Sequence, residues 1–270
     1  MEQIIALITD FGLKGQHYVA QMKGVILEIN PNAKIVDLTH NITPYSILEA
    51  SYILNTSYEY FPENTIFVVV VDPGVGSSRE ILAIKTVLNY YIICPNNGIF
   101  SELQIIEECF VVENEEFFDK PVSNTFHGRD IMAPVAAHIS IGTLLNEVGP
   151  PIDLADIRKL DLIHEVDLHK HILRATVQSI DSFGNIITNI ALMETSFGDL
   201  FNLLKEHNQI RVEFQDHLFE GLFAPNYDTV PKGSLILIKG SSGFLELSIN
   251  QGNASNELGI QVGDIITINF

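Results

Sequence analysis

Basic residues, cysteine and tryptophan are scarce in this sequence. Its 270 residues include 15 Lys and Arg against 34 Asp and Glu, which gives a formal net charge of −19. An acidic surface of this kind repels phosphate backbones, so we expect no nucleic-acid partner. The two cysteines, Cys94 and Cys109, are far apart and form no CxxC pattern. They are expected to be buried free thiols in a reducing cytosol.

Long apolar runs are absent too. No run approaches the roughly 20 residues that a membrane-spanning helix needs, so we expect no membrane contact. The first residues, Met1-Glu2-Gln3, lack the basic region of a secretory signal peptide. A cytoplasmic location is therefore expected. The hydrophobic content of 46% is enough for two ordinary domains or for one large domain.

The motifs of several common enzyme classes are also missing. The sequence contains no P-loop and no GxGxxG after a strand, so no phosphate motif is evident. Neither GxSxG nor HExxH occurs, which leaves a serine hydrolase or a zinc protease without support.

The stretch Thr65–Arg79, TIFVVVVDPGVGSSR, is the centre of the chain. Its run of β-branched and aromatic residues predicts a strand that is buried on both faces. The strand ends on Asp72, and the proline and two glycines that follow predict a tight turn. Open α/β sheets bind ligands at the carboxyl ends of their strands. Arg79, a cation in a region nearly free of basic residues, is expected to meet Asp72 there.

The first half of the chain alternates strands with helices. Ser46 and Glu49 form a capping box that opens one helix, and Asp130 is expected to be the N-cap of another. This alternation predicts a three-layer α/β domain with a mostly parallel sheet, over residues 1–152. The expected strands are 4–9, 34–38, 66–71, 81–86, 90–94 and 110–112, and the expected helices are 19–29, 46–60, 100–107 and 131–139.

The pattern changes after Gly149-Pro150-Pro151. Residues 153–169 are charged and weakly periodic, which favours a linker or arm. Residues 170–270 are expected to form an all-β domain, a small barrel or sandwich, because short strands alternate with turns. The expected strands are 171–180, 185–190, 210–214, 234–239, 244–249 and 265–269, with one helix at 196–206.

Candidate site residues occur in both halves. Asp10 and Asp72 both end predicted strands, so their carboxylates would share one rim, although each also suits a turn or cap. His127 would be a general-base candidate if it shared that rim, while a lone histidine is more often structural. His169 and His171 would point to one face of a strand, but no partner stands at ligand spacing and we expect no metal site.

Two turns of the second half carry further candidates. Asp181-Ser182-Phe183-Gly184-Asn185 suits an ordinary hairpin turn. Phe183 also offers a stacking face, and Asn185 offers a paired donor and acceptor for an adenine edge. Gly240-Ser241-Ser242-Gly243 is equally turn-like and precedes Glu246 on a predicted strand.

Taken together, these motifs resemble one family along nearly the whole chain, the S-adenosylmethionine (SAM) hydrolases. These SAM hydroxide adenosyltransferases are related to fluorinase and chlorinase. Each motif is weak alone, but seven in order make a specific signal. They are Thr9-Asp10-Phe11-Gly12, Val36-Asp37-Leu38-Thr39-His40, Val71-Asp72-Pro73-Gly74-Val75-Gly76, Pro95-Asn96-Asn97-Gly98, Phe126-His127-Gly128-Arg129-Asp130, Asp181-Ser182-Phe183-Gly184-Asn185 and Ser241-Ser242-Gly243.

The resemblance implies an α/β domain, a β-barrel and a homotrimer with active sites between adjacent subunits. It implies that SAM and water give adenosine and L-methionine, with SAM as substrate and no cofactor. The family's catalytic set falls on Asp72, Arg79 and His127. In the halogenating relatives, a tyrosine takes the position of Asp72 and a serine takes the position of Gly128, so this chain has the hydrolase residue at both.

The resemblance also assigns the substrate contacts. Asp10 would bind the ribose hydroxyls, Phe126 would pack near the sugar, and Gly15-Gln16 replaces an acidic residue that the family commonly has near the methionine amine. The remaining implied contacts are Asn185, Phe183 and the backbone near Ala254 for the adenine, and Asp181, Ser242 and Glu246 for the methionine end.

Two other functions stay open at this point. One is a SAM-dependent halogenase that forms 5′-halo-5′-deoxyadenosine, which Asp72 and Gly128 disfavour. The other is a protein that binds SAM or adenosine without catalysis, which the altered Gly15-Gln16 region motivates.

Overall fold

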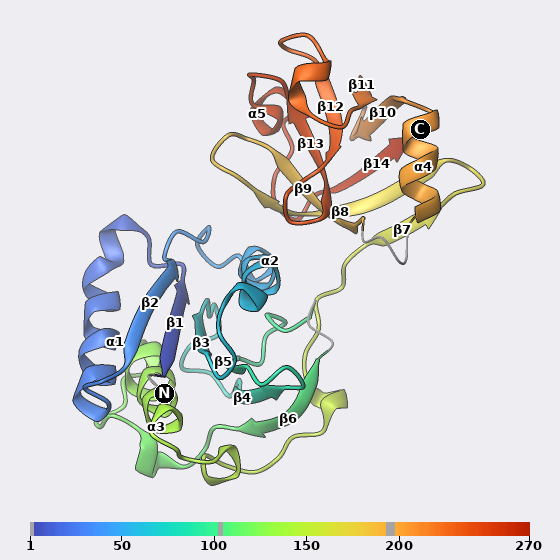
Figure 1. Ribbon diagram of the computed structural model, residues 1–270. Helices are drawn as coiled ribbons and strands as arrows, with labels where there is room; N and C mark the ends of the chain where they lie inside the picture. The colour runs from blue at the N-terminus through green and yellow to red at the C-terminus, as the bar shows by residue number, and fades with distance from the viewer. Residues whose placement is uncertain (1–2, 102–104, 193–197) are drawn as a thin grey trace. The chain divides into compact units, whose positions relative to one another are not determined.

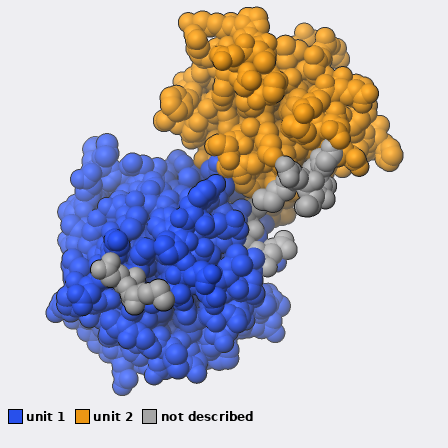
Figure 2. Space-filling model, in the orientation of Figure 1, with its two compact units in different colours: residues 1–160 blue, residues 161–270 orange. Residues whose placement is uncertain are grey.

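The computed structural model describes residues 3–101, 105–192 and 198–270. The chain forms two compact units, residues 1–160 and 161–270 (Figures 1 and 2). Each unit has its own hydrophobic core, so each is described by itself. Within the described ranges, no helix is both long and apolar enough to cross a membrane.

The first unit is built on a mixed, mostly parallel sheet in the order β2-β1-β3-β5-β4-β6. Strand β4 runs antiparallel to both of its neighbours, and the other pairings are parallel. This arrangement confirms the α/β class predicted for this half. The strands are β1 (Ile4–Thr9), β2 (Lys34–Thr39), β3 (Ile66–Val70), β4 (Ile81–Thr86), β5 (Tyr91–Pro95) and β6 (Ile106–Val111).

Helices cover both faces of this sheet (Figure 1). Helices α1 (Gln16–Ile29) and α3 (Ala133–Ser140) pack on one face, and α2 (Ile47–Ser57) packs on the other. Alternate residues of β3 therefore enter two different cores: Val68 joins the α1 and α3 side, while Phe67 joins the α2 side. A strand that is apolar at every position suits this double burial.

The order of the strands defines the place where ligands bind in such sheets. The chain leaves β1 through α1 to β2, and then returns past β1 through α2 to β3. The crossovers lie on opposite faces, so the carboxyl ends of β1 and β3 flank a topological switch point. Asp10 follows β1 directly, and Asp72 stands two residues after β3.

The second unit is a closed barrel of seven strands, which confirms the β-barrel expected for the second half. The strand order is β14-β10-β11-β12-β13-β9-β8, and the barrel closes because β14 also pairs with β8. Strand β7 pairs with β8 as well but is not one of the seven barrel strands. All barrel pairings are antiparallel except the short pairing of β11 with β12. The elements are β7 (His164–Asp167), β8 (Ile172–Ile180), β9 (Ile186–Ala191), α4 (Gly198–Glu206), β10 (Gln209–Phe214), β11 (His217–Phe223), β12 (Leu235–Lys239), β13 (Phe244–Ile249), α5 (Ala254–Leu258) and β14 (Ile265–Asn269).

Several local predictions differ from the structure. Ile106 and Glu107, expected to end a helix over 100–107, belong to β6, and 102–104 of that helix lie outside the described residues. Residues 196–197 of the helix expected at 196–206 also lie outside them. Two strands were not predicted, β11 and β7, and β7 lies within the expected arm 153–169.

Candidate active site

The turn after β3 folds Arg79 back onto Asp72. The guanidinium Nη2 donates to Asp72 Oδ2, and both side chains are more than nine-tenths buried. The backbone N–H of Gly74 donates to Asp72 Oδ1 at 3.1 Å, and Arg79 Nη1 donates to the carbonyl of Glu80 at 2.7 Å. Among the described residues, the buried Arg79 Nε–H has no hydrogen-bond partner. The site thus holds an ion pair and, in the Nε–H, a buried cationic donor that no described residue uses.

Burial dominates the electrostatics of this pair. It raises the pKa of the Asp72 carboxyl, although Arg79, the Gly74 N–H and His127 act in the opposite direction. Burial likewise lowers the pKa of Arg79, against the effect of Asp72. An arginine stays protonated at neutral pH even after such a shift.

His127 belongs to the same group of charges. It is the N-cap of a short π-helical turn, Gly128–Met132, that leads into α3. Burial and the charge of Arg79 lower the pKa of His127, while Asp72 and Asp130 act to raise it. The imidazole is therefore neutral at pH 7 and can accept a proton. The structure brings Asp72, Arg79 and His127 together at one end of the sheet.

Two glycines allow the two loops of this group to pack closely. Gly76 has φ +79°, and a Cβ there would lie 2.2 Å from the carbonyl oxygen of Asn124. At Gly128, a Cβ would lie 2.7 Å from Val70 Cγ1 at the end of β3. The His127 segment therefore rests directly on the strand and turn that carry Asp72.

Asp130 does not cap a helix as expected. It lies inside the π-helical turn, where its buried carboxylate accepts from Arg129 Nε at 2.5 Å and from the Ser123 N–H at 2.7 Å. Asp130 therefore ties the preceding loop to the turn. A π-helical turn beside a candidate base is notable, because such turns recur at functional sites.

Asp10 lies at the end of β1 with its carboxylate held by the loop after β2. The backbone N–H of Tyr45 donates to Asp10 Oδ2 at 2.8 Å. Tyr45 has φ +69°, and 70% of its surface is exposed. Tyr45 was not predicted from the sequence, because no periodicity or motif marks an exposed aromatic residue with a left-handed backbone.

An aromatic cluster joins the Asp10 loop to the His127 loop. The rings of Phe11, Tyr18 and Phe126 contact one another edge to face, with centroids 5.3–5.7 Å apart. The Arg129 guanidinium lies over the Phe126 ring, 5.0 Å from its centroid. Beside this cluster is a cavity of about 490 Å³. The predicted residues Asp10 and Phe126 are therefore linked through Phe11.

In the second unit, the loop between β8 and β9 packs against the start of α5. Asp181 Oδ1 accepts from the backbone N–H groups of Phe183 and Asn185, both at 2.9 Å, and Asp181 Oδ2 accepts from Asn185 Nδ2 at 2.8 Å. The N–H of Ser255 donates to the Gly184 carbonyl at 3.0 Å, next to the buried Ala254. Phe183 is 74% exposed, so its ring is available to a ligand.

Glu246 and Asp181 lie near Tyr227, another residue that was not predicted from the sequence. The Tyr227 hydroxyl donates to Glu246 Oε1 at 2.9 Å. Burial raises the pKa of Tyr227, and the charges of Glu246 and Asp181 raise it further. Ser242 lies in the turn between β12 and β13, half-buried. The predicted residues of the second unit thus form a second set.

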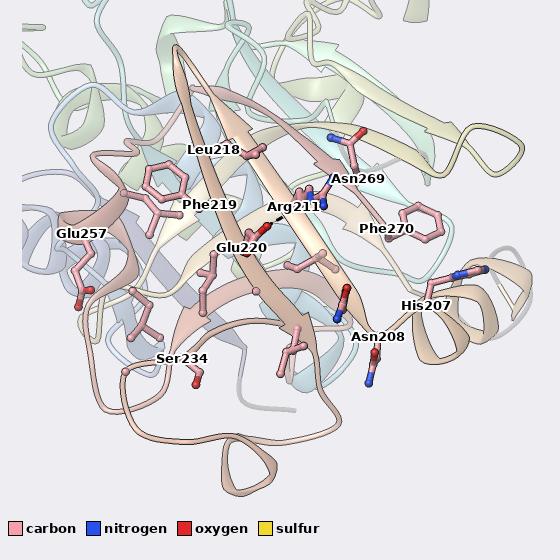
Figure 3. A pocket seen from close by; sticks show the side chains of 18 residues that line it. His207, Asn208, Arg211, Leu218, Phe219, Glu220, Ser234, Glu257, Asn269 and Phe270 are labelled. Carbon is pink, nitrogen blue, oxygen red and sulfur yellow. Dashed lines mark ion pairs between the residues drawn. The ribbon is translucent and has the colours of Figure 1, made fainter.

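A cavity in the second unit contains none of the predicted residues. It measures about 1190 Å³ and is lined by the β10–β11 hairpin, the start of β12, the end of α5 and the end of the chain (Figure 3). Arg211 and Glu220 meet across the hairpin at 3.7 Å. His169 and His171, expected on one strand, lie instead in the turn between β7 and β8. The His171 ring stacks on Phe270 and lies tilted against His207. In the described ranges, no cluster of three or more His, Cys, Asp or Glu is arranged to hold a metal ion.

Comparison with known proteins identifies the family. The SAM hydroxide adenosyltransferase N-terminal domain matches residues 5–149, and the C-terminal domain of the same family matches residues 175–267. The chain belongs to the SAM hydroxide adenosyltransferase family. An (R)-S-adenosyl-L-methionine hydrolase from Methanocaldococcus jannaschii is 36% identical, over 98% of this chain and 95% of the relative.

Two further comparisons extend this result. A fluorinase from an Actinoplanes species is 25% identical, over 98% of this chain and 97% of the relative. The crystal structure of an uncharacterized conserved protein from Thermotoga maritima aligns with a TM-score of 0.87 and 38% identity, over 98% of this chain and all of that chain. The two-unit architecture is therefore shared with a solved structure.

The contact of Gly76 with Asn124 generates a prediction about stability. Gly76→Ala combines a strained positive φ with a backbone clash, so we expect the free energy of unfolding to fall by about 2–5 kcal/mol. Gly142→Ala is the matched control: its φ is +111°, but nothing lies within 4 Å of its Cβ position. That variant should lose only about 1–2 kcal/mol. Equal losses in urea denaturation would contradict the contact.

Proposed function

We propose that the protein hydrolyses SAM to adenosine and L-methionine by attack of water on C5′ of the ribose. The observation that carries this proposal is the buried Asp72–Arg79 pair beside the neutral His127. The hydrolase names of full-length relatives at 30–36% identity support it. Those names specify the (R) form of SAM, which we propose as the substrate here too.

The proposed mechanism prepares an oxygen nucleophile. The water oxygen forms a bond to C5′ while the C5′–S bond breaks, and its electron pair goes to sulfur. Methionine leaves as a neutral thioether because the sulfonium loses its charge. His127 accepts the proton of the water, and Asp72 orients the water by accepting a hydrogen bond. The unused Nε–H of Arg79 would stabilise the developing hydroxide.

We propose substrate contacts from both sets of residues. Asp10 binds the ribose hydroxyls, with Phe126 near the sugar and the exposed Tyr45 as an additional wall. In the second set, Asn185 reads the adenine edge beside Phe183 and the backbone near Ala254. Asp181, Ser242 and Glu246 hold the methionine end.

The alternatives have distinct expectations. A halogenase would form 5′-halo-5′-deoxyadenosine at high halide, whereas we expect none. At Gly128, Val70 leaves no room for a side chain without movement. A protein that only binds SAM would show tight binding in calorimetry without product. We favour hydrolysis because a buried carboxylate, a spare cationic donor and a neutral base together are catalytic groups rather than binding groups alone.

Removing the Asp72 carboxylate tests the mechanism. Purified protein incubated with SAM should yield adenosine and methionine in equal amounts by chromatography. Asp72→Asn should lower kcat by about 10²–10⁴-fold, the usual contribution of acid–base groups. Because Arg79 loses its charge partner, the unfolding free energy should also fall, by up to about 3–5 kcal/mol. Circular dichroism and SAM calorimetry check that the variant is folded and still binds, and unchanged turnover in such a variant would refute the role of Asp72.

The lowered pKa of His127 predicts the pH dependence. In the folded protein this pKa lies below its ordinary value of 6.5, so the base form predominates at neutral pH. The value of kcat/KM should be level from about pH 7 to 8 and should fall as the pH drops below about 6.5. Asp72 titrates in the same direction, so His127→Asn separates the two groups. An acid limb that keeps its position in this variant would contradict the assignment.

We also propose a homotrimer in the cytoplasm, with active sites between adjacent subunits. The two free, buried cysteines support a reducing compartment.

Light scattering should give about 90 kDa, three chains of 30.1 kDa. Asp72→Asn and Asp181→Ala chains, when co-expressed, should regain about a quarter of the wild-type activity. Random assembly makes about three quarters of the trimers mixed, and each mixed trimer has one intact site out of three. A monomeric mass, or no regain, would contradict the shared site.

A further inference from the structure

A row of polar side chains connects helix α1 to the end of β1 and has no role in the mechanism above. Lys23 Nζ of α1 donates to Asp37 Oδ2 at 2.6 Å. His40 Nε2 lies 3.1 Å from Asp37 Oδ1, at an angle too bent for a regular hydrogen bond. On its other side, the His40 ring approaches Thr9 Oγ1, 3.0 Å from Nδ1. The row ends one residue before Asp10.

The contacts at the two ends of this row decide which of its atoms donate hydrogen bonds and which accept them. Although burial acts to raise it, the contacts with Lys23 and His40 hold the pKa of Asp37 below its ordinary value, so Asp37 is an anion at neutral pH. An anion beside Nε2 favours the tautomer with its hydrogen there, and Nδ1 is then an acceptor. Thr9 Oγ1 donates to Nδ1 and accepts from the N–H of Phe11 at 3.3 Å.

The main chain of His40 holds the same loop from a second direction. Its carbonyl accepts from the N–H of Gly12 at 2.7 Å, which closes the turn that follows Asp10. Two residues beyond His40, the N–H of Ile42 donates to the Thr9 carbonyl at 3.4 Å. The same loop then supplies the Tyr45 N–H that holds the Asp10 carboxylate. Ring and backbone therefore converge on one short segment.

We infer that His40 is a positioning residue that sets the place of the Asp10 carboxylate through Thr9 and the loop to Tyr45. The inference rests on the proposed function for the identity of the ligand, an adenosyl ribose. It assigns His40 no contact with the substrate. The side chain of His40 is only 15% exposed, which suits a residue that acts through others.

The expected signature is a change in substrate binding rather than in the chemical step. Ribose contacts are made in the ground state and in the transition state alike, so their loss raises KM and leaves kcat nearly unchanged. His40→Ala should raise the KM for SAM about tenfold, the equivalent of one lost hydrogen bond. His40→Asn, which keeps an acceptor near the place of Nδ1, should show a smaller rise.

A double-mutant cycle separates positioning from general destabilisation. Thr9→Val and His40→Ala remove the two partners of one hydrogen bond, so the double variant should raise KM no more than about twofold above either single variant. The matched control is Ser140→Ala, which removes a buried 2.8 Å hydrogen bond from Asn30 in the same unit. Residues 30–34 follow α1 and lead into the start of β2, away from the carboxyl ends of the strands. This variant should lose stability and keep the wild-type KM.

The same cycle is repeated with adenosine in calorimetry, which requires no turnover. Additive effects on KM and on adenosine affinity, or a KM rise of the same size in Ser140→Ala, overturn the role of His40. If SAM is not hydrolysed but adenosine binds with the expected coupling, the positioning role holds and the proposed hydrolysis fails. A wild-type chain that neither binds adenosine nor hydrolyses SAM overturns both.

Discussion

The buried ion pair of Asp72 and Arg79 is the interaction on which the rest of the first unit's site depends. Two opposite charges removed from water are stable only where further hydrogen bonds satisfy them. The turn provides those bonds through the Gly74 N–H and the Glu80 carbonyl. Asn97 Nδ2 donates to the Val71 carbonyl at 2.9 Å and holds the end of the strand in place. The geometry of the pair is thus imposed by its surroundings.

The fold separates the rigid scaffold from the chemical groups. Strand β3 is buried on both faces, and it carries Asp72 out of the sheet where α1 and α2 cross on opposite sides. His127 comes from a different loop, and Asp10 comes from β1. The residues proposed as general base, water-orienting carboxylate and ribose-binding group therefore come from three segments that are distant in sequence.

The parts of this arrangement that are local or strongly periodic could be predicted from the sequence. Arg79 lies seven residues from Asp72 in one turn, so their meeting followed from glycine and proline chemistry. The apolar strands of both units likewise have clear signals. Tyr45 and Tyr227 were not predicted, because their roles depend on partners far along the chain. Strand β11 was not predicted either, since Gly221 and imperfect alternation hide it.

Two predictions were wrong or incomplete because tertiary contacts decided the outcome. Asp130 has the residue type of an N-cap, but Ser123 and Arg129 occupy its carboxylate inside a π-helical turn. Ile106 and Glu107 have a helical pattern, yet pairing with β4 makes them part of a strand. In both cases, a local preference for a helix start or for helix, about a few tenths of a kcal/mol per residue, is overridden by burial and strand pairing.

The parallel pairing of β11 with β12 has a consequence for the dynamics of the barrel. It spans two residue pairs, Leu222 with Ile236 and Phe223 with Leu237, whereas each of the other described barrel pairings spans three or more. The cavity of about 1190 Å³ lies at this seam, where Leu222 and Leu235 line it. Sheets open first where the fewest ladder bonds must break together. Backbone amides along this seam should therefore exchange with deuterated solvent sooner than those of β8 and β14. The seam is thus the place where we expect the barrel to open locally.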